Sequence, residues 1–338
     1  MRSERLVSSI DFHTAGIGMR LLTSGVPRVP GATIADKRRH FEKHLDHLRT
    51  GLCLEPRGHP SLLIAVLVEP VTPGADFGLL FMYPGGYYVS CGEATIGAAT
   101  IAVATGMVAR RGDATRVLID TEAGPIETIA HGDGDRVRAV TITWTPAYVL
   151  GAAIVKLSDI GDVPVDLAVG AGNVFAIVDT ESAGVALRRE AASEIARRGM
   201  AVRAAVNEQV RIPAPAGGVT PIENVIVHEP LGRAAESRAH GVSRNALVWG
   251  PGQVDVAPCG SGTCARMALF HQRGVLAVGE SYTSEGLSGL TFTGRLAGET
   301  TVDGRPAVLP EITGSAHITG TSQFFFDPGD PLREGLRP

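Results

Sequence analysis

Two segments that lie half a chain length apart limit what this sequence can fold into. The first runs from Cys91 through the letters CGEAT to Gly106, and the second runs from Cys259 through CGSGT to Gly274, so each glycine follows its cysteine by fifteen residues. In each copy a strand-like stretch ends at the cysteine and an apolar run follows, which predicts a helix that begins directly after the thiol. The repeat indicates two similar α/β halves.

A thiol at the start of a helix is chemically reactive. The first turn leaves N–H groups without intrahelical partners and carries about half a positive charge. The pKa of a free thiol, about 8.5, falls toward neutrality in such a place, and the same N–H groups bind carboxylates. Two thiols and two anion-binding helix ends therefore predict a small carboxylate ligand held between two acid/base groups, which transfer protons at the neighbouring carbon.

Composition excludes several other classes of protein. The 338 residues suffice for two domains, and with 44% hydrophobic residues, 20% charged residues and a net charge of -4 they indicate neither disorder nor nucleic-acid binding. The apolar runs are too short for a signal peptide or a membrane span, so a cytoplasmic location without a membrane partner is expected. All four cysteines are expected as reduced thiols, with Cys53 and Cys264, which lack the repeated context, in the core.

The pattern between the motifs predicts mainly strands. Their expected positions are 6–12, 18–24, 62–69, 77–83, several within 106–146, a pair within 166–179, 220–228 and 246–249. Further helices are expected at 34–50 and 186–200, and a loop at 213–218. Each half is expected to be a curved, mainly antiparallel sheet wrapped around one buried helix. The expected domains are residues 1–160, completed by 316–338, and residues 161–315.

The two predicted central helices differ in their side chains. Residues 95–105 carry no charge, so the first helix is expected to be buried all round. Residues 263–273 include several large polar or charged side chains, which predict that one face of the second helix reaches solvent. These are Arg266, His271, Gln272 and Arg273.

For other residues near the cysteines, a functional role has to be weighed against a structural one. Cys259 and Cys264 stand five residues apart with neither a second cysteine pair nor a histidine pair nearby, so no metal site is predicted. Asp255, four residues before Cys259, is either a ligand for a substrate ammonium or a solvated strand residue. Glu93 can simply complement the dipole of the helix in whose first turn it stands.

With these residues in view, the chain resembles the proline racemase family, whose fold resembles that of diaminopimelate epimerase. The similarity spans nearly the whole chain, and the second cysteine motif is highly specific. The matching segments are Asp11–Gly16 with Arg20, Glu55–His59, Gly85–Tyr87 before Cys91 and Gly92, Gly172 with Asn173, Asp255 with Pro258–Thr263, and Gly294 with Arg295.

The resemblance implies cofactor-independent inversion at Cα of proline or hydroxyproline. Cys91 and Cys259 would remove and return the proton on opposite faces of the ring, and Asp255 would contact the ring nitrogen. The substrate carboxylate would bind backbone N–H groups at the two helix starts. These belong to Gly92, Glu93, Gly260 and Ser261.

The sequence departs from the family pattern in the expected substrate pocket. Glu93 stands where family members generally have a histidine that helps to bind the ring nitrogen. Leu63 and Trp249 occupy wall positions at which proline racemases tend to have phenylalanine. The smaller Leu63 leaves room for a ring hydroxyl, and His228 is the expected partner of that hydroxyl. These positions favour 2-epimerisation of 4-hydroxyproline.

Three alternatives stay open: racemisation of proline, dehydration of trans-3-hydroxyproline by a lyase, and a family-derived binding protein without turnover. Dehydratases of the family commonly replace one cysteine by serine or threonine, so the two intact cysteines favour inversion over elimination. The expected ligand is a small imino acid, and neither a metal nor a cofactor is expected. Assembly as a homodimer is left open.

Overall fold

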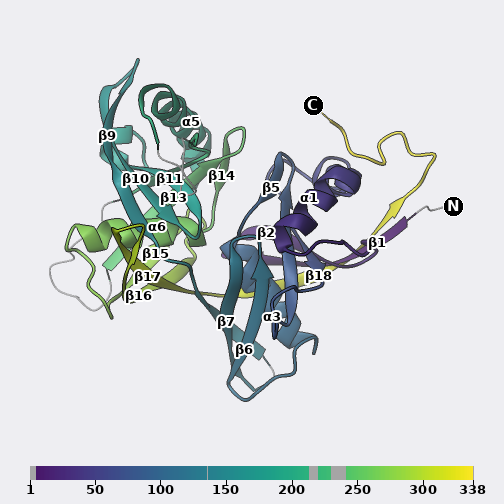
Figure 1. The fold of residues 1–338 in the computed structure, drawn as a ribbon. Helices are drawn as coiled ribbons and strands as arrows, with labels where there is room; N and C mark the ends of the chain where they lie inside the picture. The colour runs from purple at the N-terminus through teal and green to yellow at the C-terminus, as the bar shows by residue number, and fades with distance from the viewer. Residues whose placement is uncertain (1–4, 135, 213–219, 230–240, 338) are drawn as a thin grey trace. The chain divides into compact units, whose positions relative to one another are not determined.

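The computed structural model describes residues 5–134, 136–212, 220–229 and 241–337. The chain divides into two compact units, Met1–Ile142 with Ser315–Pro338, and Thr143–Gly314. The boundary near residue 142 differs from the expected one at 160 because β9 (Tyr148–Leu157) forms an antiparallel hairpin with β10 (Gly161–Gly170) and so belongs to the second unit. The expected architecture, an α/β sheet around a central helix in each unit, is confirmed (Figure 1).

The first unit is built on a strand pair from the two ends of the chain. β1 (Arg5–Thr14) pairs along its length with β18 (Ala316–Phe326) and, through a tight turn, with β2 (Ile17–Ser24). β3 (Leu63–Val68) lies parallel to β2 and antiparallel to β4. The other strands are β4 (Phe77–Tyr83), β5 (Gly86–Tyr88), β6 (Ala114–Thr121), β7 (Gly124–Asp133) and β8 (Arg136–Thr143).

The central helix of the first unit is α3 (Gly92–Ala104), which contacts β18, β1 and β7. Every residue from Gly92 to Val103 is buried, as expected for a helix without charged residues after its first turn. A Cβ atom on Gly97 would overlap the ring of Phe12, so this glycine allows the helix to approach β1 closely. The close approach of α3 to β1 therefore fixes where the helix begins.

Two short helices pack on the outer side of the first unit. They are α1 (Ile34–His44), which begins at a capping box formed by Thr33 and Asp36, and α2 (Asp46–Cys53). The single helix expected over 34–50 is thus interrupted, because Leu45 leaves the helical conformation at φ -128°. The pair shares one apolar cluster with β3 and β4, to which Phe41 and Leu48 contribute.

The second unit has a mixed sheet. β11 (Asn173–Asp179) pairs with β10 and runs parallel to β12 (Asn224–His228), which pairs with β13 (Gly241–Trp249). β13 forms a hairpin with β14 (Gln253–Asp255) and lies parallel to β15 (Ser281–Glu285). The remaining strands are β16 (Thr291–Val302) and β17 (Arg305–Gly314), which pair with each other.

Three helical segments follow β11, and the longest of them packs on the sheet of this unit. α4 (Thr180–Ala183) and the 3-10 turn η1 (Arg189–Ala191) lead into α5 (Ala192–Gln209), which packs on β9, β12 and β13. α5 starts and ends later than the helix expected at 186–200, and the loop expected at 213–218 lies outside the described residues. In the described parts of the chain, each helix is too short or too polar to cross a membrane.

The central helix of the second unit is α6 (Gly260–Gln272), which packs against β10, β17 and β9. The expectation that one of its faces reaches solvent is wrong. All residues from Gly262 to Phe270 are buried, including Arg266, and the exposed positions are confined to its C-terminal end, at Gln272 and Arg273. The charged residue in the middle of this helix therefore belongs to the interior of the unit.

Candidate active site

The two repeated cysteines occupy the N-cap positions of the two central helices, as the sequence predicts. Cys91 precedes α3 in extended backbone, at φ -148°, and its carbonyl accepts the first helical hydrogen bond, from Thr95 N–H at 3.0 Å. The Thr95 hydroxyl donates to the same carbonyl at 2.7 Å. Because helix geometry directs the first N–H groups outward at this end, the Cys91 side chain stands beside an anion-binding helix start.

Glu93 distinguishes the first half-site, which is the start of α3 with Cys91, from the second, which is the start of α6 with Cys259. The Cys91 S–H donates to Glu93 Oε2 with a sulfur–oxygen distance of 3.8 Å. A carboxylate this close opposes a second negative charge on the sulfur. Glu93 is itself held in place from β1, because the Thr14 hydroxyl donates to the Glu93 carbonyl at 2.8 Å.

Cys259 adopts a different conformation at the equivalent position. Its φ of +58° lies in the left-handed region, which is strained for a residue with a side chain. This conformation folds the sulfur over the helix start, where Sγ accepts a hydrogen bond from Gly262 N–H at 3.3 Å. A Cβ atom on Gly262 would lie 2.9 Å from that sulfur, so the close approach requires glycine.

The two thiols therefore differ in their hydrogen bonding. Cys91 donates its proton to a carboxylate, whereas Cys259 accepts from a backbone amide and stands next to the hydroxyl of Ser261, with Sγ and Oγ 3.9 Å apart. Hydrogen bonds from N–H donors stabilise a thiolate, and a carboxylate acceptor stabilises a thiol. The hydrogen bonds around the two sulfurs thus run in opposite directions.

The hairpin of β13 and β14 carries two further predicted residues of the second half-site. Leu247 pairs with Asp255 and Trp249 pairs with Gln253, so Trp249 and Asp255 are diagonal neighbours on one face of the hairpin. Asp255 Oδ1 accepts a hydrogen bond from Ala257 N–H at 2.8 Å, which fixes the carboxylate just before the cysteine turn. Both side chains are therefore anchored on a strand pair next to Cys259.

Comparisons with known proteins agree with this geometry. The profile of the family described as Proline racemase matches residues 9–337. The chain belongs to the proline racemase family. A 4-hydroxyproline 2-epimerase of Streptosporangium roseum is 41% identical over 99% of both chains, and a proline racemase of Clostridioides difficile is 36% identical over 99% of both. A solved hydroxyproline epimerase from Agrobacterium vitis with bound trans-4-OH-L-proline aligns at 30% identity and a TM-score of 0.90, over 100% of this chain and 96% of that one.

His228 ends β12 in this proline racemase family member. Its ring packs against Phe270, with ring centroids 6.1 Å apart, and its Nδ1–H donates to the Glu229 carbonyl at 3.0 Å. Phe270 follows Cys259 by eleven residues in α6, which corresponds to roughly 16 Å along the helix. The role of His228 as the partner of a substrate hydroxyl stays a prediction.

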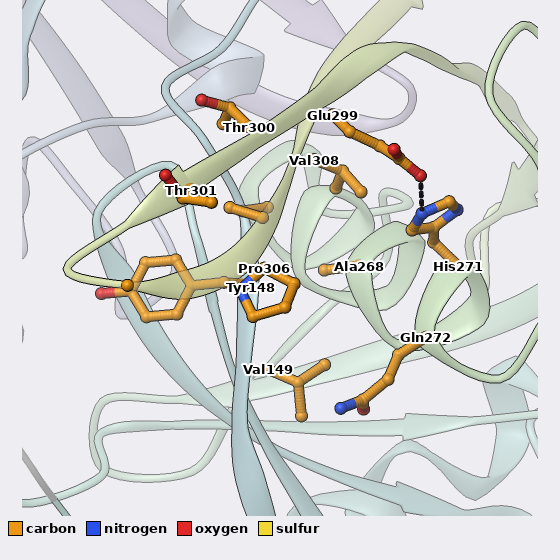
Figure 2. A pocket seen from close by; sticks show the side chains of 13 residues that line it. Tyr148, Val149, Ala268, His271, Gln272, Glu299, Thr300, Thr301, Pro306 and Val308 are labelled. Atoms are coloured by element: carbon orange, nitrogen blue, oxygen red, sulfur yellow. Dashed lines mark hydrogen bonds and ion pairs between the residues drawn. The ribbon is translucent and has the colours of Figure 1, made fainter.

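The buried surroundings of His228 keep its ring uncharged. Burial, assisted by the positive charge of Arg266, lowers the pKa of His228 to about 3, so the ring is neutral in the folded protein. The ring lines a pocket of about 390 Å³ together with Asp179 and Phe270. A second pocket, of about 610 Å³, lies where the end of α6 meets β16 and β17. It includes the contact between His271 Nε2 and Glu299 Oε1, which are 2.8 Å apart (Figure 2). Neither lining set, over the described residues, includes a cysteine.

The remaining sequence-predicted residues lie in defined places. Leu63 begins β3 and is buried beside Met19 of β2, and its role as a pocket wall stays a prediction. Cys53 and Cys264 are buried thiols outside any disulfide, as expected, and burial raises the pKa of Cys53 to about 12. A thiol with such a pKa stays protonated at neutral pH and is chemically inert.

Two features of the half-sites were missed at the sequence level. One is the hydrogen bond from Thr14 to the first turn of α3, although Thr14 lies inside a matched family segment. The other is the interior location of Arg266, for which the sequence offers a weak signal: the residues around it, Cys264, Ala265 and Met267, are small or apolar.

Proposed function

We propose that this protein epimerises 4-hydroxyproline at Cα without a cofactor, using Cys91 and Cys259 as the two acid/base groups. The observation that carries the proposal is the placement of the two thiols at the starts of the two central helices with opposite hydrogen bonding. The choice of 4-hydroxyproline is supported by the name of the Streptosporangium roseum relative and by the ligand of the Agrobacterium vitis structure.

The hydrogen bonding of the thiols suggests a starting state for the reaction. The Cys259 thiolate removes the Cα proton, and the electron pair of that C–H bond passes into the carboxylate. The Cys91 thiol then gives its proton to the opposite face of the planar carbon. After one inversion Cys259 carries the proton and Cys91 is the thiolate, which is the state required to process the product epimer in the reverse direction.

The helix starts supply the stabilisation that such a carbanion needs. Their N–H groups at Gly92, Glu93, Gly260 and Ser261 would hold the substrate carboxylate, onto which negative charge spreads in the transition state. Asp255 would hold the ring nitrogen as a cation. Both interactions use groups that are fixed before the substrate binds, so little reorganisation accompanies the proton transfer.

The test is hydrogen exchange at Cα in heavy water. The purified protein is incubated separately with proline, with trans- and cis-4-hydroxyproline, and with trans-3-hydroxyproline. We expect inversion of 4-hydroxyproline with one deuterium at Cα, and loss of inversion in Cys91→Ala and in Cys259→Ala. Cys53→Ala, which removes an inert thiol, is the matched control and should stay active. Inversion that persists in either of the first two variants would refute the two-base assignment.

The same panel separates the alternatives. Faster inversion of proline than of 4-hydroxyproline would identify a proline racemase. Formation of a cyclic imine and then a keto acid from trans-3-hydroxyproline would identify a lyase. Binding of an imino acid without deuterium at Cα would identify a protein that has lost turnover, for which Glu93 in place of the family histidine would be the first residue to exchange.

A further inference from the structure

Arg266 is a buried cation whose hydrogen-bond partners are all uncharged. It stands in the middle of α6 with no exposed surface. Its Nη1 donates to the Ser284 hydroxyl at 3.2 Å, and its Nη2 donates to the hydroxyl and the carbonyl of Ser243. Over the described residues it forms no ion pair with a carboxylate. Burying a charge costs free energy unless another group pairs with it or hydrogen bonds to it.

Aromatic rings provide the rest of the surroundings of the guanidinium. Its carbon lies 5.5 Å from the ring centroid of Phe270 and 5.8 Å from that of Tyr282. Cation–π contacts of this kind favour the charged form of arginine. The side chain is thus held as a cation by two rings, two hydroxyls and a carbonyl, and it contributes one uncompensated positive charge to the interior of the unit.

A chain of hydroxyl groups connects this cation to the turn that carries Cys259. The Ser284 hydroxyl lies 2.9 Å from the Thr263 hydroxyl, which donates to the Pro258 carbonyl at 3.1 Å. Thr263 N–H also donates to the Cys259 carbonyl at 2.8 Å. Since helical side chains lean toward the N-terminus, Arg266 reaches back toward the start of its own helix. The network therefore forms hydrogen bonds to Pro258 and to Cys259, the two residues of the strained cysteine turn.

Other charges near α6 are paired among themselves. On the strands packed against the helix, Asp166 pairs with Arg273 and Glu299 pairs with His271. On β13 and β15, Arg244 pairs with Glu285. Among the described residues, further titratable groups around the cation and Cys259 include the Asp255 carboxylate, the Tyr282 phenol, the neutral His228, and the thiol of Cys264. Burial lowers the pKa of Arg266, while Tyr282 and a thiolate at Cys259 raise it.

The first unit offers a natural comparison. Seven residues after Cys91, the position equivalent to Arg266 is Ala98, which is buried in α3. The threonine of the network has its counterpart in Thr95, but the cation does not. At the matching positions of the two helices, α3 thus carries Glu93 and Ala98, whereas α6 carries Ser261 and Arg266. The carboxylate near Cys259 comes from β14 instead, where an Asp255 oxygen lies within 4.8 Å of the sulfur.

We propose that Arg266 is a positioning residue for Cys259, which holds the cysteine turn through Ser284 and Thr263 and favours the thiolate form of that sulfur by its charge. This inference rests on the proposed function, because it explains which of the two thiols starts as the base. It is tested on the protein without substrate, so its outcome is separate from that of the epimerisation assay.

The experiment measures alkylation of Cys259 by iodoacetamide as a function of pH, followed by mass spectrometry of the peptide that contains it. In Arg266→Met we expect the pH midpoint of alkylation to rise by on the order of one unit. Arg266→Lys, which keeps the charge, should recover at least half of that shift. Arg273→Met, which removes a charge from the other end of the same helix, is the matched control and should leave the midpoint unchanged.

A purely structural role for Arg266 would change the melting temperature without moving the alkylation midpoint. An unchanged midpoint in Arg266→Met, or an equal shift in Arg273→Met, would overturn the proposal. If Arg266→Met does not fold, Ser284→Ala decides the question, because it loosens the guanidinium while keeping its charge: a raised midpoint supports the proposal and an unchanged one refutes it. A shift found in a protein that epimerises no substrate would uphold the role of Arg266 and refute the proposed function.

Discussion

Replacing Glu93 by glutamine should make Cys91 ionise at lower pH. The substitution keeps the size of the side chain and removes the negative charge that lies 3.8 Å from the sulfur. In the native protein a thiolate at Cys91 would face this carboxylate, and the repulsion between like charges would oppose its formation. In Glu93→Gln that repulsion is absent, while the helix start continues to favour a negative sulfur.

The distance between the two groups sets the size of the effect. Two unit charges about 4 Å apart interact by about 1 kcal/mol in water and by about 4 kcal/mol at an effective dielectric constant of about 20. At about 1.36 kcal/mol for each pH unit, the midpoint of Cys91 ionisation should fall by roughly 0.7 to 3 units. Because the side chains are next to a helix start rather than in bulk water, we expect a value inside this range rather than at its lower end.

The assay is the pH dependence of Cys91 alkylation by iodoacetamide, read at the Cys91 peptide by mass spectrometry. Glu93→Asp serves as the matched variant, because it keeps the charge and shortens the side chain. A midpoint in Glu93→Gln that equals or exceeds that of the native protein would refute the electrostatic reasoning. The same variant should also weaken the preference for Cys259 as the initial base, so the rates of the two epimerisation directions should change by different factors.

Three further predictions concern stability. Cys259→Ser should be more stable than Cys259→Ala by about 1 kcal/mol in urea unfolding, because a serine oxygen can accept the Gly262 N–H, and equal stabilities would contradict the capping role of position 259. Gly97→Ala should lower the free energy of unfolding by about 1–3 kcal/mol, because the new methyl group overlaps the Phe12 ring, and a neutral effect would show that α3 can move away. The His228 pKa of about 3 lies below that of an unfolded histidine, so its contribution is complete above pH 6.5 and is lost as the pH falls toward 3. The native protein should therefore lose about 2 kcal/mol between pH 7 and pH 5 that His228→Gln does not lose, as measured by unfolding at both pH values.

The starts of α3 and α6 could be predicted from the sequence because they rest on local patterns. A strand, a cysteine, a glycine and an apolar run occur twice with the same spacing, and each local signal agrees with its copy. The interruption at Leu45 could not be predicted in this way. The charged and apolar residues continue the helical period through 34–50, and the break depends on how α1 and α2 pack on β3 and β4.

The interior of the second half-site was unpredictable for a different reason. An arginine in an amphipathic pattern normally faces solvent. Arg266 is buried because Ser243 and Ser284 reach it from β13 and β15, and the pairing of those strands is not local in sequence. The position of the His228 ring beside Phe270 of α6 depends likewise on the parallel pairing of β11 and β12, which is not local in sequence.

The pairing of β1 with β18 has a consequence for the order in which the protein can be completed during synthesis. The second unit is continuous in sequence, so all of its strands have been made before residues 315–338 leave the ribosome. The first unit has to wait for β18, whose residues pair with β1 from Arg5 to Thr14 and contact α3. A nascent chain that stops at residue 314 would contain both cysteines and still leave the Cys91 helix exposed on the side that β18 covers. We therefore expect the second unit to become protease-resistant first, and the first thiol to acquire its native surroundings only with the final twenty-odd residues of the chain.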